Sequence, residues 1–320
     1  MGDAGSFANP APGSRPSTSL LVLALLAVLF AWSINYIVGK ITLTHFDALT
    51  LASFRLQISA LVLLSLYFTR RNRTPLDRRD LWTFAYLGFF GYAINQGGFV
   101  TGLSLTTSEH SVIIVALGPI LILGMARAMG LETLTPGKVF GMLISFCGVI
   151  VLETDSGSPL HSPLLFGDLI SLAGTLGYSI YTVLAKRVAG TYDTISINAF
   201  SATVGAIVWL PVALRQGSRL HWAGVGLPGW AGLLYMVLFS SVGGYLLFYW
   251  LLRHMEASRV VVVNYFQPVV VVLLSIPLLA ERPTTRLLVS GVLVLLGVYL
   301  TERASARERA QKSSVPQSAA

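Results

Sequence analysis

The chain has 320 residues and a formal net charge of +8, with 54% apolar and only 11% charged residues. An average soluble domain carries roughly 25% charged residues. This composition excludes a free-standing water-soluble fold and indicates a polytopic membrane protein. The positive charge does not indicate nucleic-acid binding, because the basic residues lie between apolar segments. The single cysteine, Cys147, lies in an apolar run and cannot form an intramolecular disulfide.

The first 17 residues are rich in Gly, Ser, Pro and Ala, which predicts a disordered cytoplasmic tail over 1–17. The apolar run that follows begins near Leu20 and continues past Trp32 to Val38. It is longer than the apolar region of a secretory signal, and no clear cleavage site follows it. We therefore expect an uncleaved first membrane span.

Helical spans need about 20 apolar residues to cross roughly 30 Å of hydrocarbon. Breakers or polar residues separate the apolar runs at Arg70 to Asp80, Leu134 to Gly137, Ser156 to Pro163 and Arg215 to His221. The sequence predicts an all-α integral membrane protein with ten transmembrane helices, at 18–38, 48–68, 81–102, 109–129, 137–152, 164–187, 195–214, 229–251, 258–279 and 285–302.

The basic residues predict the orientation. With the N-terminus inside, 16 of the 22 Lys and Arg residues fall in cytoplasmic segments and five in outer segments, while Arg55 lies within a span. This bias follows the positive-inside rule and places both termini in the cytoplasm. The linker 153–163 then faces outward, and residues 303–320 form a cytoplasmic tail.

Seven residues of the first half, called landmarks here, recur in the same order in the second half. The second copy follows the first at an offset of 146 residues and, after one change of three residues in length, at 149. The repeat units are 18–152 and 164–302, with five predicted spans each. The landmarks are Lys40, Asp47, Phe54, Pro119, Glu132, Thr135 and Gly148, answered by Lys186, Asp193, Phe200, Pro268, Glu281, Thr284 and Gly297.

An odd number of spans in each copy forces the second copy to enter the membrane upside down. The predicted fold is therefore two inverted five-helix repeats. Inverted repeats are typical of secondary transporters, in which two bundles move around a site near the membrane midplane.

Polar and aromatic side chains recur at helical spacing within several spans, where burial in hydrocarbon is costly unless they face a cavity or another helix. Under the repeat, Trp32 corresponds to Tyr178, Asn35 to Tyr181 and Gln96 to Tyr245. Each residue can also serve structure alone, in an aromatic belt at the membrane interface or as a tie between helices. The candidate substrate-binding residues are Trp32, Asn35, Tyr36, Tyr92, Asn95, Gln96, Tyr178, Tyr181, Tyr245, Asn264 and Gln267.

Three further residues are candidates for structural or gating roles. Arg55 can bind a substrate carboxylate as a bidentate fork, or it can extend to the membrane interface or bond helix-end carbonyls. Pro119 and Pro268 each remove a backbone hydrogen bond within a span and can kink it. The carbonyls freed near Val115 and Asn264 can face a solute or be satisfied by a neighbouring helix.

Two acidic motifs lie near the ends of spans. Glu109 and His110 begin the fourth span, where a titrating pair can couple transport to protons; a simple helix start with Glu at the positive end of the dipole is the favoured interpretation. Glu132 and Glu281 are expected to cap the next helix or to pair with Lys138 and Arg286.

The doubled pattern resembles the drug/metabolite transporter superfamily, specifically EamA-type proteins with ten spans. The features that carry the resemblance are the segment Ala31–Asn35 (AWSIN), Phe54-Arg55, and in each half a Pro in the fourth span followed by Glu-x-x-Thr and a Gly-containing span. Ser201 stands where the first half has Arg55, so this Arg is not duplicated. The resemblance covers about residues 20–302 and implies export or exchange of small metabolites, amino acids or drug-like solutes.

We therefore predict a secondary transporter of the bacterial cytoplasmic (inner) membrane that works by alternating access, with a small solute and the lipid bilayer as partners. Its polar and aromatic lining suits neutral, zwitterionic or aromatic solutes. A channel or a non-transporting membrane scaffold is the alternative, and a homodimer stays open. An enzyme is not expected, because no carboxylate pair lies mid-span and no His spacing fits a metal site. No cofactor, metal or nucleic acid is expected.

Overall fold

The computed structural model describes residues 16–130, 134–153, 163–185, 187–255, 260 and 262–314, which form helices and turns without a strand. Residues 1–15, Glu132 of the first Glu-x-x-Thr motif, Lys186 and most of the predicted linker lie outside this described part. The fold is therefore all-helical where it is described, as the apolar runs predict.

In the first half, the described helices follow the five predicted spans. They are α1 (Thr18–Thr42), α2 (Ala48–Thr69), η1 (Arg78–Asp80), α3 (Leu81–Gly88), η2 (Phe89–Ile94), α4 (Asn95–Leu105), α5 (Ser108–Val115), α6 (Gly118–Ala128) and α7 (Pro136–Glu153).

The second half repeats this order. Its described helices are α8 (Pro163–Ala185), α9 (Thr194–Arg219), η3 (Trp222–Gly224), α10 (Gly226–Tyr235), η4 (Met236–Gly244), α11 (Tyr245–His254), α13 (Val262–Leu279) and α14 (Thr285–Ser314).

Seven helical segments of the described chain are long and apolar enough to cross a membrane. Two shorter apolar helices, Pro136–Leu152 and Phe266–Leu279, accompany them. The third predicted span, formed by α3, η2 and α4, is not among these nine segments, because Asn95 and Gln96 lower its mean hydropathy. The structure thus defines a multi-pass membrane protein.

The second helix of each half begins with the same aspartate cap. The Asp47 carboxylate accepts a hydrogen bond from the backbone N–H of Thr50 at 2.9 Å and another from the Thr50 hydroxyl. Asp193, 146 residues later, accepts from the backbone N–H groups of Ile195 and Ser196 and from the Ser196 hydroxyl. Such caps satisfy N–H groups that the first turn of a helix leaves unpaired. The repeat seen in the sequence therefore extends to local structure.

The third span of each half contains a π-helical segment at the corresponding place. An offset of 149 carries η2 into η4. In each segment a glycine lies against an aromatic ring of the other half: Gly91 against Tyr181 and Gly244 against Trp32. A side chain at either glycine would overlap that ring. π-helical segments are rare and often mark functional sites.

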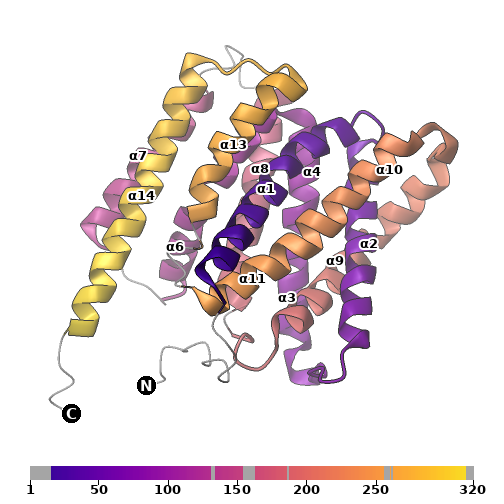
Figure 1. Cartoon of the computed structure of the whole chain (residues 1–320), viewed down its shortest axis with the longest axis horizontal. Helices are drawn as coiled ribbons and strands as arrows, with labels where there is room; N and C mark the ends of the chain where they lie inside the picture. Colours follow the sequence, from indigo (N-terminus) through magenta and orange to yellow (C-terminus); the bar gives the residue numbers. More distant parts are fainter. Residues whose placement is uncertain are drawn as a thin grey trace.

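Helices of the first half pack directly against helices of the second half. The helix α2 packs against α9, α7 against α14, and α8 against α4 and α6, while α1 contacts α10, η4, α11 and α13. In Figure 1 the pair α7 and α14 stands along one margin of the bundle. The start of α1 and the end of α14 lie at the same side of the bundle, the lower one in this view.

The contact between α7 and α14 depends on small residues. Gly141 and Gly297 face each other across it, and Ser145 Oγ donates a hydrogen bond to the Val294 carbonyl at 2.9 Å. Small residues let membrane helices approach closely. The helix α14 also continues well past the predicted span, because its charged end is rich in good helix formers and Glu308 forms an ion pair with Lys138 of α7 at 2.6 Å.

Gly297→Val should weaken this contact. A Cβ atom at position 297 would collide with Ser145 Oγ and the Gly141 carbonyl oxygen, and overpacking of this kind costs about 1–3 kcal/mol. Thermal unfolding of the purified protein in detergent should therefore occur at a lower temperature. Gly190→Ala is the matched control, since a Cβ atom there meets nothing within 4 Å. Equal unfolding temperatures for both variants would contradict the close contact.

Candidate functional site

A cavity of about 1210 Å³ lies between the two halves. Ligand pockets commonly measure roughly 300–1,000 Å³, so this space can hold a small solute together with water. Its walls come from α1, α2, α4, α5 and α6 of the first half and from α8, α9, η4, α11, α13 and α14 of the second.

Nine of the eleven candidate binding residues line this cavity: Trp32, Asn35, Tyr36, Asn95, Gln96, Tyr178, Tyr245, Asn264 and Gln267. Tyr92 and Tyr181 lie behind the wall instead. The Tyr92 hydroxyl donates to Asn198 Oδ1 at 2.7 Å, and Tyr181 is 2% exposed and packs against Tyr92 and Tyr178. The helical spacing of polar and aromatic residues thus identified helix faces near the cavity. That these residues bind a solute stays a prediction.

The amides of the wall differ in how far the protein already satisfies them. Asn95 donates a hydrogen bond from Nδ2 to the Gly174 carbonyl at 3.0 Å, which ties α4 to α8. Asn35 is buried and its Oδ1 has no hydrogen-bond partner in the described structure. A buried polar atom without a partner costs free energy. Asn35 is therefore better placed than Asn95 to receive a solute.

Aromatic rings surround the space on the α1 side. The Trp32 ring lies edge-on to Tyr245 with centroids 5.6 Å apart, and its Nε1 donates to the Ser240 carbonyl at 3.3 Å. Tyr36 meets Phe99 edge to face at 5.1 Å. These rings offer apolar faces, and Tyr36 and Tyr245 add phenolic hydroxyls to the same wall.

The two prolines lie in different surroundings. Pro119 lines the cavity just after a break in the fourth span, where α5 ends at Val115 and α6 begins at Gly118. Pro268 is buried inside α13 and is not part of the lining. Asn264, four residues before Pro268, does line the cavity. Only the first proline is thus at the cavity itself.

Arg55 is 3% exposed and lies at the cavity wall. Its Nε donates to Ser241 Oγ at 2.9 Å, and its Nη2 lies 3.4 Å from Ser240 Oγ. Its guanidinium lies over the Phe99 ring, 5.4 Å from the centroid. The side chain therefore neither extends to the interface nor bonds a helix-end carbonyl, because hydroxyls of η4 take two of its nitrogens.

Several lining residues were not singled out from the sequence. Ser240, Tyr249 and Asn198 all line the cavity. Tyr249 lies one helical turn after Tyr245, and Ser240 and Asn198 lie within apolar runs. The rule that polar residues within a span face a cavity or a helix would have found them. The rule does not say which of the two they face.

Buried polar groups form a cluster beyond one end of the cavity wall, one turn before Ser171 of α8. His110 Nδ1 lies 2.8 Å from Asp168 Oδ2, and both side chains are almost fully buried. Thr106 donates from its hydroxyl to the other oxygen of Asp168 at 2.6 Å. This cluster joins the α4–α5 turn of the first half to α8 of the second.

The end of α13 adds a second link at the same end. Ser275 Oγ donates to Glu109 Oε1 at 3.0 Å, and the Ser108 backbone N–H donates to Glu281 Oε1 at 3.1 Å. Glu281 thus caps α5 of the first half, whereas the sequence predicted a cap on the following helix or a pair with Arg286. The residues of this end, including Ser108, Glu109 and Glu281, are absent from the cavity lining.

Several residues of the cavity lining are exposed. They include Arg303 and Ala306 in the C-terminal half of α14, and Phe266, Leu296 and Tyr299 within α13 and α14. The end of α14 lies at the side of the bundle where α1 begins. The part of the lining with Tyr192, Thr194, Arg303 and Ala306 is called the mouth below.

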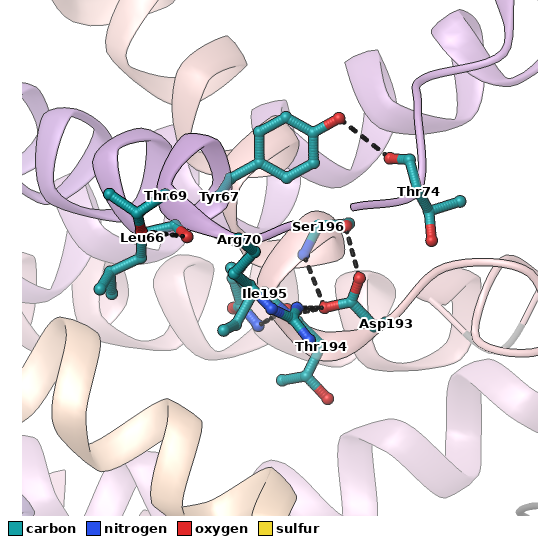
Figure 2. Close-up of polar contacts among 10 residues, drawn as sticks. Leu66, Tyr67, Thr69, Arg70, Thr74, Asp193, Thr194, Ile195 and Ser196 are labelled. Carbon is teal, nitrogen blue, oxygen red and sulfur yellow. Dashed lines mark hydrogen bonds and ion pairs between the residues drawn. The ribbon is translucent and has the colours of Figure 1, made fainter. Parts of the chain in front are cut away.

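An ion pair stands at this mouth. Figure 2 shows the Asp193 carboxylate between Ser196 and Arg70, whose Nη1 lies 2.5 Å from Oδ1. Partial burial acts to raise the pKa of Asp193, but hydrogen bonds from Ser196 and Arg70 and the charge of Arg70 outweigh it and lower that pKa. Tyr192, the preceding residue, donates from its hydroxyl to Asp80 Oδ2 at 2.8 Å. The mouth thus links the α2–α3 connection to the start of α9.

Comparison with known proteins identifies the class. The model of the EamA-like transporter family matches residues 19–154 and again 165–303. A transporter of Archaeoglobus fulgidus is 28% identical over 88% of this chain and 98% of its own. A protein of Escherichia coli (strain K12) named as a probable amino-acid metabolite efflux pump is 26% identical over 87% of this chain and 93% of its own. The inner membrane transporter YedA of the same strain is 25% identical over 87% and 89%.

The fold has a counterpart among solved structures. One crystal structure matches 91% of this chain and 99% of its own with a TM-score of 0.60, at 18% identity. The chain belongs to the EamA-like transporter family and contains two copies of its domain. It is an integral membrane transporter, as the sequence resemblance predicts.

Variants of Asp193 should separate the stability that its helix cap contributes from the stability that its charge contributes. Asp193→Ala removes both and should cost about 1 kcal/mol of stability. Asp193→Asn keeps a capping side chain and should lose only the partly exposed ion pair, roughly 0.2–1 kcal/mol. Because the folded-state pKa is lowered, this charge contribution is complete above the ordinary Asp pKa of about 3.9 and is lost as pH falls through the lower folded value.

Thermal unfolding of wild type and Asp193→Asn should therefore differ by a constant amount near neutral pH and converge below about pH 4. Asp47→Asn, at the corresponding cap, is the control for the same substitution at a cap without a described ion pair. A difference that persists unchanged at acidic pH would mean that the Asp193 charge does not stabilise the mouth.

Proposed function

We propose that this transporter works by alternating access, with ten membrane helices arranged as two inverted five-helix repeats. The observation that carries the proposal is one cavity that both halves line. We infer that the cavity opens at the mouth and that the buried cluster at His110 and Asp168 closes it at the opposite end. The matching aspartate caps and π-helical segments support the repeat. Packing of each half on the other supports movement of one bundle against its partner.

The distribution of basic residues supports an orientation in which both termini are cytoplasmic. The open end of the cavity lies at the side of the termini, so the described conformation faces inward. In this orientation the cluster at His110 and Asp168 closes the outer end. Relatives from bacterial inner membranes support the cytoplasmic membrane as the location.

A solute taken up from the cytoplasm and released outside makes the protein an exporter or an exchanger. The relative named as an amino-acid metabolite efflux pump supports small metabolites as the substrate class. The closed end favours a carrier over a channel, because an open channel needs a continuous path. The cavity wall offers polar and aromatic groups for binding, and we propose transport rather than catalysis.

Removing single amides from the wall should impair transport. Asn35→Ala, Gln96→Ala and Asn264→Ala should each lower solute flux about 3- to 30-fold. Loss of one hydrogen bond costs about 0.5–1.5 kcal/mol, and it costs more where the former partner is left buried without a bond. Aromatic amino acids are suitable first probes in counterflow assays with liposomes. Ser65→Ala is the control: its hydroxyl bonds the Leu61 carbonyl of the same helix, away from the cavity. Wild-type flux in all three variants would remove the cavity from the transport path.

Weakening the closed end should expose the cavity from outside. Asp168→Asn removes the charge that faces His110 at 2.8 Å, so the outward-open conformation should gain population. In a Cys147→Ala background, Ser171→Cys places a thiol on the cavity wall one turn along α8. A membrane-impermeant thiol reagent added outside should label it several-fold faster when Asp168→Asn is also present.

Ser218→Cys, on the exposed end of α9, is the positive control for outside labelling. Transport and labelling should respond together, because both depend on the same change of conformation. Unchanged labelling of the cavity thiol, with Ser218→Cys fully labelled, would argue against this cluster as the outer closure.

A further inference from the structure

Arg55 has a nitrogen that the protein itself does not use. The guanidinium carries five N–H donors, and its Nε and Nη2 meet the hydroxyls of Ser241 and Ser240. Its Nη1 is buried and has no hydrogen-bond partner in the described structure. If Arg55 only linked α2 to η4, two of its nitrogens would have partners. The third would stay buried without a hydrogen bond, which costs free energy.

The charge of Arg55 is likewise not balanced by the residues around it. Among the described residues that line the cavity, Glu302 is the acidic one, and it neighbours Arg303 on α14 near the open mouth. The direct contacts of Arg55 are neutral hydroxyls and the Phe99 ring. Buried charges are normally paired, because an isolated charge in an apolar environment is strongly disfavoured.

The surroundings of Arg55 provide donors for an anion. Tyr36 and Tyr245 line the cavity with phenolic hydroxyls, and Ser240 lines it beside the guanidinium. A guanidinium with neighbouring hydroxyls matches a carboxylate, which accepts several hydrogen bonds in one plane. The aromatic faces of Trp32 and Phe99 then remain for an apolar body.

We propose that Arg55 binds a carboxylate of the transported solute, with Nη1 and the adjacent hydroxyls as hydrogen-bond donors. This inference rests on the proposed transport function, because it names the class of solute that the cavity accepts. Ser201 occupies the repeat-related position, so the second half supplies no matching cation. One buried positive charge fits a single carboxylate better than a dianion such as a phosphate monoester.

The test uses three probes that share one aromatic body. These are 3-phenylpropanoate, L-phenylalanine and the neutral 3-phenylpropanamide, each titrated into the purified full-length protein at neutral pH while thermal unfolding is followed. A ligand that binds only the folded state stabilises it by RT ln(1 + L/Kd), where L is the free ligand concentration, so the rise of the unfolding temperature with ligand concentration reports the affinity. Both carboxylates should raise the unfolding temperature as their concentration increases, and the amide should bind at least tenfold more weakly. The two carboxylates distinguish a simple monoanion from a zwitterion.

Variants assign the effect to Arg55. Arg55→Gln should weaken carboxylate binding roughly 10- to 100-fold, as expected for loss of a charge-assisted hydrogen bond, and it should abolish the preference over the amide. Arg55→Lys should keep part of the preference, since it keeps the charge but not the fork. If Arg55→Gln does not fold, Ser241→Ala provides the measurement, because it keeps the charge and loosens its position. Gln57→Ala, two residues along α2, should bind like wild type.

The outcomes separate this proposal from transport itself. Three results would each overturn the carboxylate seat, that is, binding of the carboxylate at Arg55. They are equal binding of the amide and the carboxylates, no concentration-dependent shift with either carboxylate, and an unchanged preference in Arg55→Gln. Counterflow of the same probes in liposomes provides the second readout. Carboxylates that bind through Arg55 but do not cross the membrane would overturn transport and leave the seat intact. Counterflow of the amide that equals that of the carboxylates would leave transport intact and overturn the seat.

Discussion

The hydrocarbon of a bilayer offers no hydrogen bonds, so a polar group within a span must find its partner inside the protein or in a water-filled space. This constraint explains how the two halves are joined. The Gln57 amide donates to the Ala206 carbonyl, and Trp209 Nε1 donates to the Ala93 carbonyl. Both bonds cross from one half to the other. Polar residues of the spans therefore bind the halves together where they meet, and they line the cavity where they do not.

Some of the buried polar groups without a partner lie at the cavity wall. Asn35 Oδ1 and Arg55 Nη1 are both buried there without a partner in the described structure. Such groups raise the free energy of the empty protein, and a solute that satisfies them binds more favourably for that reason. The same physical rule that stabilises the bundle thus also equips its centre for binding.

The two ends that we propose for the cavity are built differently. At the end proposed to be closed, carboxylates of Asp168 and Glu281 are held by groups of the first half, and Thr106 and Ser108 bond to them directly. At the mouth, the Asp193 carboxylate of the second half pairs with Arg70 of the first half. Closing and opening by movement of one half against the other requires that links such as those at Asp168 can break and re-form. Buried, short links of this kind favour two discrete arrangements over a continuum.

The sequence by itself determined the membrane class, the positions of the helices, the internal repeat and the family, because apolar run length and landmark spacing depend on local chemistry. It also selected nine residues that line the cavity, since polar side chains within spans are costly. It did not separate Tyr92 and Tyr181 from that wall, because helical spacing gives a face but not the neighbour that covers it. Only the tertiary structure decided that Glu281 caps α5 and that Arg55 meets two serines of the other half, because these depend on contacts between residues more than 150 positions apart.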